Sequence, residues 1–193
     1  MAEVASTFAE ILVFEAQMRG SDDATRLNAY CQQIEQGIGT IFRQTALYRF
    51  EQSVHAARRT SGELSVARLG ELFQENVGAM FGDSLTLTEG HAIWWSYIGH
   101  FIASPFYVYA YAFGEMLALA LFHRYREGSA GFIARYLDLL RAGGSLSPSE
   151  LVAPMGVDLT DRSFWTGAID VFANEVASFE QLARSLHPEK FVD

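Results

Sequence analysis

Residues 100–122 read H-F-I-A-S-P-F-Y-V-Y-A-Y-A-F-G-E-M-L-A-L-A-L-F, and this stretch decides how the rest of the chain must fold. Pro105 predicts a helix that begins there or just after it, because proline suits the first turn of a helix. The residues that follow are nearly all apolar, so we expect this helix to be buried. Glu115 and the tyrosines interrupt the run, whereas a membrane span needs about 20 mostly apolar residues. A buried helix is therefore the better interpretation, and we expect no membrane as a partner.

The remaining sequence is patterned for helices as well, with apolar residues recurring every three or four positions. Helices are predicted over residues 3–19, 21–48, 65–80, 91–102, 105–126, 130–141 and 160–186. Ser21 is the expected cap of the second of these helices, and Ser65 opens the third. We find no linker or internal repeat that would divide the chain. The sequence therefore predicts an all-α fold, a single compact multi-helix domain over residues 1–193.

Charge and cysteine content exclude several classes of partner and site. The 193 residues carry a formal net charge of -9, which leaves nothing to neutralise phosphates, so we expect no nucleic acid as a partner. The one cysteine, Cys31, excludes an internal disulfide and fits a reducing cytoplasm. Its helical spacing with Leu27 and Ile34 predicts that Cys31 packs in the core. With no basic start and apolar run resembling a signal peptide, we expect a cytoplasmic protein.

A pattern of carboxylates lies near the N-terminus. Glu3, Ser6 and Glu10 form the pattern E-x-x-S-x-x-x-E. A spacing of seven residues is close to two helical turns, so the two carboxylates share one face of the predicted helix. By itself such a short pattern is also typical of a surface helix with solvated glutamates.

A histidine and three tyrosines mark the stretch quoted above. His100 precedes Tyr107, Tyr109 and Tyr111, and phenols with a pKa near 10 are hydrogen-bond donors at neutral pH. On a helix, Tyr107 and Tyr111 would share a face while Tyr109 points elsewhere. The alternative is an aromatic face packed in a core, with the hydroxyl groups bonded to nearby carbonyl groups.

Taken together, these two patterns resemble oligoendopeptidase F, of the thimet-type zinc metallopeptidases. Further segments that resemble the family occur in the same order, namely I-F-R-Q-T at 41–45, F-E at 50–51, W-x-x-I-x-H-F at 95–101, Y-L-x-x-L-x-x-G-G-S-x-S-P at 136–148 and G-V-D-L at 156–159. The resemblance covers most of the chain, and the shared order makes it specific. One departure is Gly99, where the family often has proline. The resemblance implies the C-terminal portion of a zincin-like helical peptidase.

The resemblance also implies an activity and a metal. The family hydrolyses internal bonds of short peptides with water activated by zinc, and it is a metalloendopeptidase family of the hydrolase class. Glu3 matches the position of its third zinc ligand. Glu10, on the same face, would orient a metal ligand by contacting that ligand and not the metal itself.

Four residues are implied on the substrate side. Tyr111 and His100 match the family's oxyanion donor and its histidine that contacts the substrate, which makes them the candidate catalytic residues. Tyr107 and Tyr109 would hold the peptide beside them.

No His-Glu-x-x-His occurs in the sequence, although this motif supplies two zinc ligands and the general base. We expect it in an upstream segment of the same chain or in another chain, so residues 1–193 alone should be inactive and bind zinc weakly at most. Apolar surface uncovered by the missing segment would favour a homo-oligomer. Two alternatives stay open, a non-enzymatic helical module that binds peptides and one half of a split peptidase.

Overall fold

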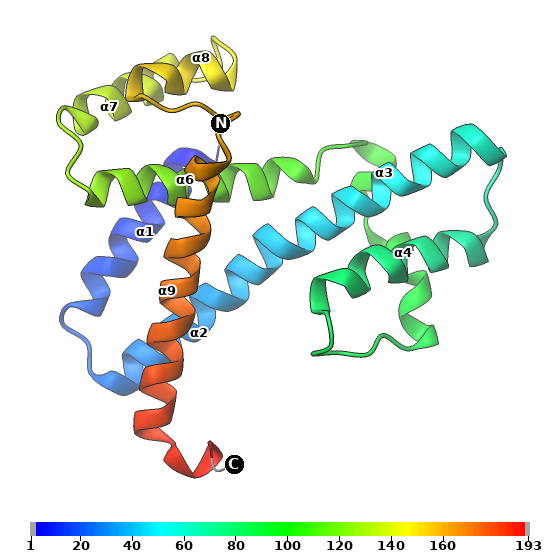
Figure 1. The fold of residues 1–193 in the computed structure, drawn as a ribbon, viewed down its shortest axis with the longest axis horizontal. Coiled ribbons are helices and arrows are strands. Elements are labelled where there is room, and N and C mark those ends of the chain that lie inside the picture. The colour runs from blue at the N-terminus through cyan, green and yellow to red at the C-terminus, as the bar shows by residue number, and fades with distance from the viewer. Residues whose placement is uncertain (1–2, 192–193) are drawn as a thin grey trace. The chain divides into compact units, whose positions relative to one another are not determined.

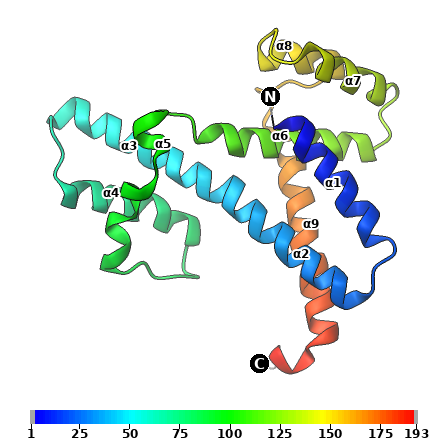
Figure 2. The ribbon, with the colours of Figure 1, turned by 180° about the vertical axis from the view of Figure 1, so that it is seen from behind.

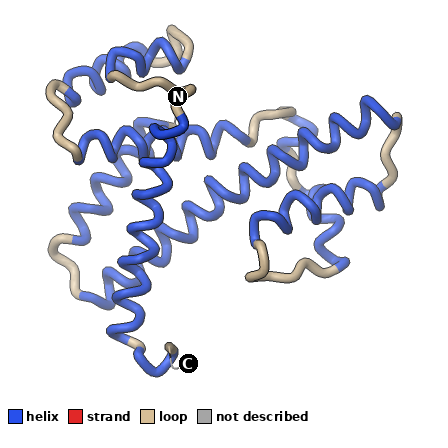
Figure 3. The backbone as a smooth tube through the Cα atoms, in the orientation of Figure 1, coloured by secondary structure: helices blue, strands red, loops and turns tan. Residues whose placement is uncertain are grey.

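The structure is a computed structural model that describes residues 3–191, and these residues contain helices and loops but no strand (Figure 3). Its elements are α1 (Val4–Met18), α2 (Asp23–Gly37), the π-helical η1 (Ile38–Arg43), α3 (Gln44–Ser61), α4 (Val66–Phe81), the 3-10 helix η2 (Glu89–Tyr97), α5 (His100–Ala103), α6 (Tyr109–Arg126), α7 (Phe132–Ala142), α8 (Pro148–Val152), η3 (Ala153–Met155), α9 (Arg162–Leu186) and η4 (Pro188–Lys190). The predicted all-α class is confirmed. Across the described residues, no helix is both long and apolar enough to cross a membrane.

Contacts within the chain divide it into two compact units. The first unit consists of Met1–Gly37 and Phe113–Asp193, and the second consists of Ile38–Ala112. Helix α6 therefore begins in the second unit and continues into the first. The single domain expected over residues 1–193 stays a prediction.

The core of the first unit forms where α1 meets α6 and α7. The Phe8 ring of α1 lies 5.8 Å from the Phe122 ring of α6 and 4.4 Å from the Tyr136 ring of α7. The predicted burial of the apolar helix is confirmed over residues 117–122, which are all buried. Helices α2 and α9 cross in both views of the chain (Figures 1 and 2), and a Cβ on Gly37 would lie 2.3 Å from the Phe172 ring. Only a residue without a side chain fits this crossing.

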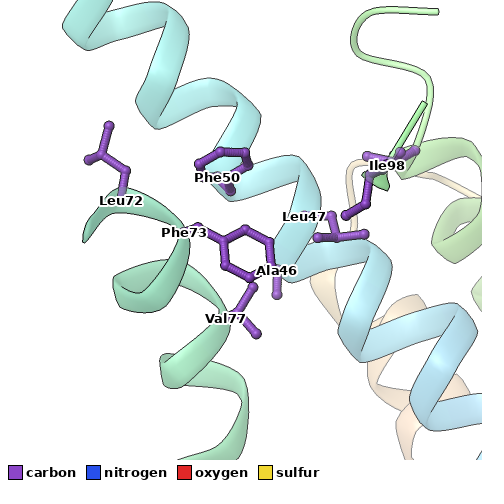
Figure 4. Close-up of a cluster of buried hydrophobic side chains, with 8 residues drawn as sticks. Ala46, Leu47, Phe50, Leu72, Phe73, Val77 and Ile98 are labelled. Atoms are coloured by element: carbon purple, nitrogen blue, oxygen red, sulfur yellow. The ribbon is translucent and has the colours of Figure 1, made fainter. Parts of the chain in front are cut away.

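The core of the second unit lies between α3 and α4 (Figure 4). Its buried members are Ala46, Leu47, Phe50, Leu72, Phe73, Val77, Ile98 and Val108. The rings of Phe50 and Phe73 meet edge to face at 5.3 Å. Helix η2 packs on α4 at Gly70, where an added Cβ would lie 2.9 Å from the carbonyl oxygen of Ala92. This core supports the segment that leads to His100.

Local chemistry sets several helix ends, and the start at Ser65 lies where the sequence predicts it. The Ser65 hydroxyl accepts a 3.2 Å hydrogen bond from the Arg68 N–H at the start of α4. At the start of α8, Ser147 and Glu150 form a reciprocal capping box. Gly143 ends α7 with a φ of 57°, which glycine adopts without steric cost.

Two predictions about α2 are wrong. Asp22, not Ser21, caps the helix, since its Oδ1 accepts a 2.8 Å hydrogen bond from the Thr25 N–H. The Ser21 hydroxyl instead donates to the Gln17 carbonyl at 2.8 Å. Cys31 is exposed and does not pack in the core. Cys31 lies roughly 120° around the helix from Gly37, the residue that meets α9. It is therefore not on the face of α2 that packs against α9.

The helix expected from Pro105 begins four residues later, at Tyr109. Phe106 causes the delay, because its φ of 59° is left-handed and cannot continue a right-handed helix. The helix expected over 91–102 is also different, being divided into the 3-10 helix η2 and the short α5.

Candidate functional site

His100, Tyr107 and Tyr111 form one cluster in the second unit. Tyr111 Oη and His100 Nε2 share a hydrogen bond of 3.2 Å, in which the tautomer of the histidine decides the donor. The His100 and Tyr107 rings are parallel to within 6° at 6.0 Å, and the Tyr107 ring meets Tyr111 edge to face at 5.5 Å. Tyr107 is 47% exposed, so this ring of the cluster is in contact with solvent. The structure thus brings three of the predicted residues together, although Tyr107 lies before the helix and not on it.

Tyr109 contacts a different part of the second unit. Its ring lies 5.5 Å from the Tyr48 ring of α3, and 49% of the residue is exposed. The expectation that Tyr109 points away from Tyr107 and Tyr111 agrees with these contacts. Its predicted role in holding a peptide stays a prediction.

Glu3 lies at the start of α1 in the first unit. Its carbonyl accepts a 3.0 Å hydrogen bond from the Thr7 N–H and another of 3.0 Å from the Ser6 hydroxyl. The Ser6 hydroxyl also lies 3.4 Å from Glu3 Oε2. Gly114 of α6 makes room for this residue, since a Cβ there would lie 3.3 Å from the Glu3 Cβ. The Glu3 carboxylate is exposed and near a hydroxyl donor, which suits an oxygen ligand.

Glu10 begins a chain of interacting carboxylates that the sequence analysis missed. Burial, followed by the negative charge of Glu10, raises the pKa of Glu115. Burial, followed by the negative charge of Glu115, raises the pKa of Glu175 to about 7. The signal in the sequence was an acidic residue inside the apolar run, which we used only to argue against a membrane span.

The surroundings of Glu10 are both polar and apolar. It lines an open hollow of about 410 Å³ whose other walls carry the amide side chains of Gln17 and Gln33 and the apolar side chains of Val13 and Phe14. These amides can donate to a carboxylate, and the role of Glu10 in orienting a metal ligand stays a prediction.

The described residues do not by themselves form a zinc site. A catalytic zinc takes three protein ligands and keeps one position open. Within residues 3–191, no three histidine, cysteine, aspartate or glutamate side chains are placed to hold a metal ion. Glu3 offers the right atom type but one ligand only, so the donor set on this chain fits zinc in part.

Comparison with known proteins gives a consistent family. The profile described as peptidase family M3 matches residues 1–171. Oligopeptidase PepF of Bacillus subtilis is 31% identical over 183 residues, which cover 94% of this chain and 27% of that protein. Group B oligopeptidase PepB of Streptococcus agalactiae is 32% identical over 191 residues, which cover 97% of this chain and 31% of that protein.

Solved structures agree with the sequence matches. The crystal structure of oligoendopeptidase-F from Enterococcus faecium superposes with a TM-score of 0.88 at 26% identity, over 95% of this chain and 35% of that one. The chain thus spans 27% of the Bacillus relative and 31% of the Streptococcus relative. The resemblance found from the motifs is confirmed.

Proposed function

The chain belongs to peptidase family M3, and we propose that it is the C-terminal portion of a zinc-dependent oligoendopeptidase. The observation that carries the proposal is the hydrogen bond of 3.2 Å between Tyr111 and His100, beside the exposed ring of Tyr107. A donor pair next to an aromatic surface suits the backbone of a short peptide. The reaction is the hydrolysis of internal peptide bonds.

On the substrate side, Tyr111 is the donor to the oxygen that becomes negative as the scissile carbonyl is attacked. If His100 Nε2–H donates to Tyr111 Oη, the phenol proton stays free to point at the substrate, and the chain of two hydrogen bonds strengthens both. Donors fixed before the reaction lower the barrier most, because they need no reorganisation when charge develops. Tyr107 and Tyr109 hold the peptide on either side.

On the metal side, Glu3 would hold the zinc through its carboxylate, and Glu10 would orient a metal ligand without touching the metal itself. Zinc held there would supply the polarisation of a carbonyl group and a bound water of lowered pKa. The remaining ligands and the base belong to a His-Glu-x-x-His segment outside residues 1–193, in the same or another chain. We therefore expect the chain alone to be inactive.

The same proposal includes short peptides as substrates and the cytoplasm as the location. Self-association through exposed apolar side chains belongs to it as well, and Ile102, at 83% exposed, is an example of such a side chain. A peptide-binding module without catalysis and a split peptidase are the other outcomes that the following test separates.

The test joins residues 1–193 to a His-Glu-x-x-His-bearing segment taken from an oligoendopeptidase F, and measures cleavage of a fluorogenic short peptide. We expect cleavage that a zinc chelator abolishes, and none from either part alone. Addition of the segment as a separate polypeptide distinguishes a split enzyme. Peptide binding that survives chelation and Tyr111→Phe, without cleavage in any combination, would instead indicate a binding module.

A further inference from the structure

Glu51 is a buried carboxylate with a single partner. It lies in the middle of α3 and is 3% exposed. Its Oε1 accepts a hydrogen bond of 2.6 Å from the backbone N–H of Phe106, whereas its Oε2 is buried without a hydrogen-bond partner among the described residues. Burying a carboxylate is unfavourable unless it is paired, so this residue needs an explanation. Its one hydrogen bond among residues 3–191 is with the segment that carries the tyrosines.

The backbone that Glu51 holds is strained. Phe106 has a φ of 59°, in the left-handed region that bulky residues rarely occupy. Such conformations persist only when the surroundings impose them, and they concentrate at functional sites. Here the Glu51 carboxylate binds the N–H of the strained residue itself.

The side chain of Phe106 is held by the same face of α3. Its ring lies 4.5 Å from the His55 ring and 6.4 Å from the Tyr48 ring. Tyr48, Glu51 and His55 are three and four residues apart, a spacing that places them on one face of a helix. One face of α3 thus fixes both the backbone and the ring of Phe106.

The tyrosines that follow the turn at Phe106 contact two different parts of the second unit. Tyr109 contacts α3 through the ring of Tyr48. Tyr107 and Tyr111 contact each other and His100. A helix beginning at Pro105 would have placed Tyr107 on the helix, so the left-handed residue decides where this tyrosine lies.

We propose that Glu51 is a positioning residue, which sets Tyr107 and Tyr111 against His100 by holding the backbone of Phe106. The proposal rests on the proposed function only for the statement that this cluster contacts a peptide. The arrangement itself can be tested without any activity.

The test compares three variants of the 193-residue chain by NMR. Glu51→Met fills the same space without an acceptor, Glu51→Gln keeps an oxygen that can accept the hydrogen bond, and Glu75→Ala removes an exposed carboxylate from α4. We expect Glu51→Met to speed hydrogen exchange of the Phe106 amide by about tenfold or more. It should also weaken the contacts between the Tyr107 and Tyr111 rings.

Glu51→Gln and Glu75→Ala should resemble the unaltered protein, and the amide of Phe73 in the core should keep its protection in all three. Rescue by glutamine separates positioning from general stability. Should Glu51→Met prevent folding, Glu51→Asp takes its place, because it keeps a carboxyl group and withdraws its oxygen atoms by one methylene. Unchanged Phe106 exchange or unchanged ring contacts would overturn the proposal. If Glu51→Met alters the ring contacts but no combination with a His-Glu-x-x-His segment cleaves a peptide, the positioning role of Glu51 stands. In that case only the proposed function is contradicted.

Discussion

The hydroxyl group of Tyr111 is the residue-scale feature on which the proposed chemistry depends most. In the completed enzyme, Tyr111→Phe keeps the ring that contacts Tyr107 and removes the donor to the oxyanion. Loss of one such donor typically costs about 2.7–4 kcal/mol, so we expect kcat to fall by about 10²–10³-fold with little change in KM. Steady-state kinetics measure this, with Tyr125→Phe as a control on a tyrosine of the first unit. An unchanged kcat would exclude Tyr111 as the donor.

The raised pKa of Glu175 leads us to expect that the free energy of unfolding depends on pH. Burial and the charge of Glu115 raise its pKa in the folded state from 4.5 to about 7. The folded state therefore prefers the neutral carboxyl group. The contribution of Glu175 to the free energy of unfolding is fully present below pH 4.5 and is lost as the pH rises through 7. We expect Glu175 to lower the free energy of unfolding by at most about 3 kcal/mol between pH 4.5 and pH 8.

Denaturant titrations of Glu175→Gln check this expectation. The variant should match the unaltered protein at low pH and be more stable at pH 8, because glutamine has no proton to lose. Glu180→Gln, on the exposed part of the same helix, should leave the pH dependence unchanged. If the stability of Glu175→Gln changed with pH in the same way as that of the unaltered protein, groups other than Glu175 would cause the pH dependence.

The sequence indicated some residues of the candidate site and missed others for a physical reason. The spacing of Glu3 and Glu10, and that of His100 and Tyr111, are local patterns that a short window contains. The importance of Glu51 depends on burial and on a partner 55 positions away, which no local pattern reveals.

At the scale of elements, the packing of η2 on α4 decides how the segment before His100 is supported. Gly70→Ala would place a Cβ 2.9 Å from the Ala92 carbonyl oxygen. Backbone atoms cannot move aside easily, so we expect a loss of about 1–3 kcal/mol in the free energy of unfolding.

Gly78→Ala is the matched control on the same helix. Its added Cβ would meet only the Leu87 Cδ1, at an ordinary 3.7 Å. Since alanine favours helix over glycine, this variant should gain about 0.5–1 kcal/mol. Urea denaturation of both variants measures the difference, and equal effects would contradict the close packing at Gly70.

Helix ends were predictable where adjacent residues determine them. The hydroxyl groups of Ser65 and Ser147 accept hydrogen bonds from backbone N–H groups three residues further on, and Gly143 ends α7 through its own backbone. The start of α6 was not predictable, because Phe106 is held in its left-handed conformation by contacts with α3. The π-helical η1 was not predicted either. The apolar residues keep their helical spacing through it, so the sequence indicates one continuous helix there.

At the scale of the whole molecule, we expect the purified 193 residues to bind zinc weakly and not to cleave peptides. Glu3 alone is a single ligand, whereas catalytic zinc needs three from protein. Calorimetric titration with zinc and a fluorogenic peptide assay measure the two properties. Zinc-dependent cleavage by the chain alone would show that it holds a complete site.

The central claim is that Glu3, His100 and Tyr111 belong to a zinc peptidase whose other metal ligands lie outside residues 1–193. The coding sequence directly upstream of the Met1 codon tests it most directly. We predict an in-frame His-Glu-x-x-His within a few helical turns before Glu3. An in-frame stop codon directly before Met1, together with no cleavage when a His-Glu-x-x-His segment is added as a separate polypeptide, would contradict the claim.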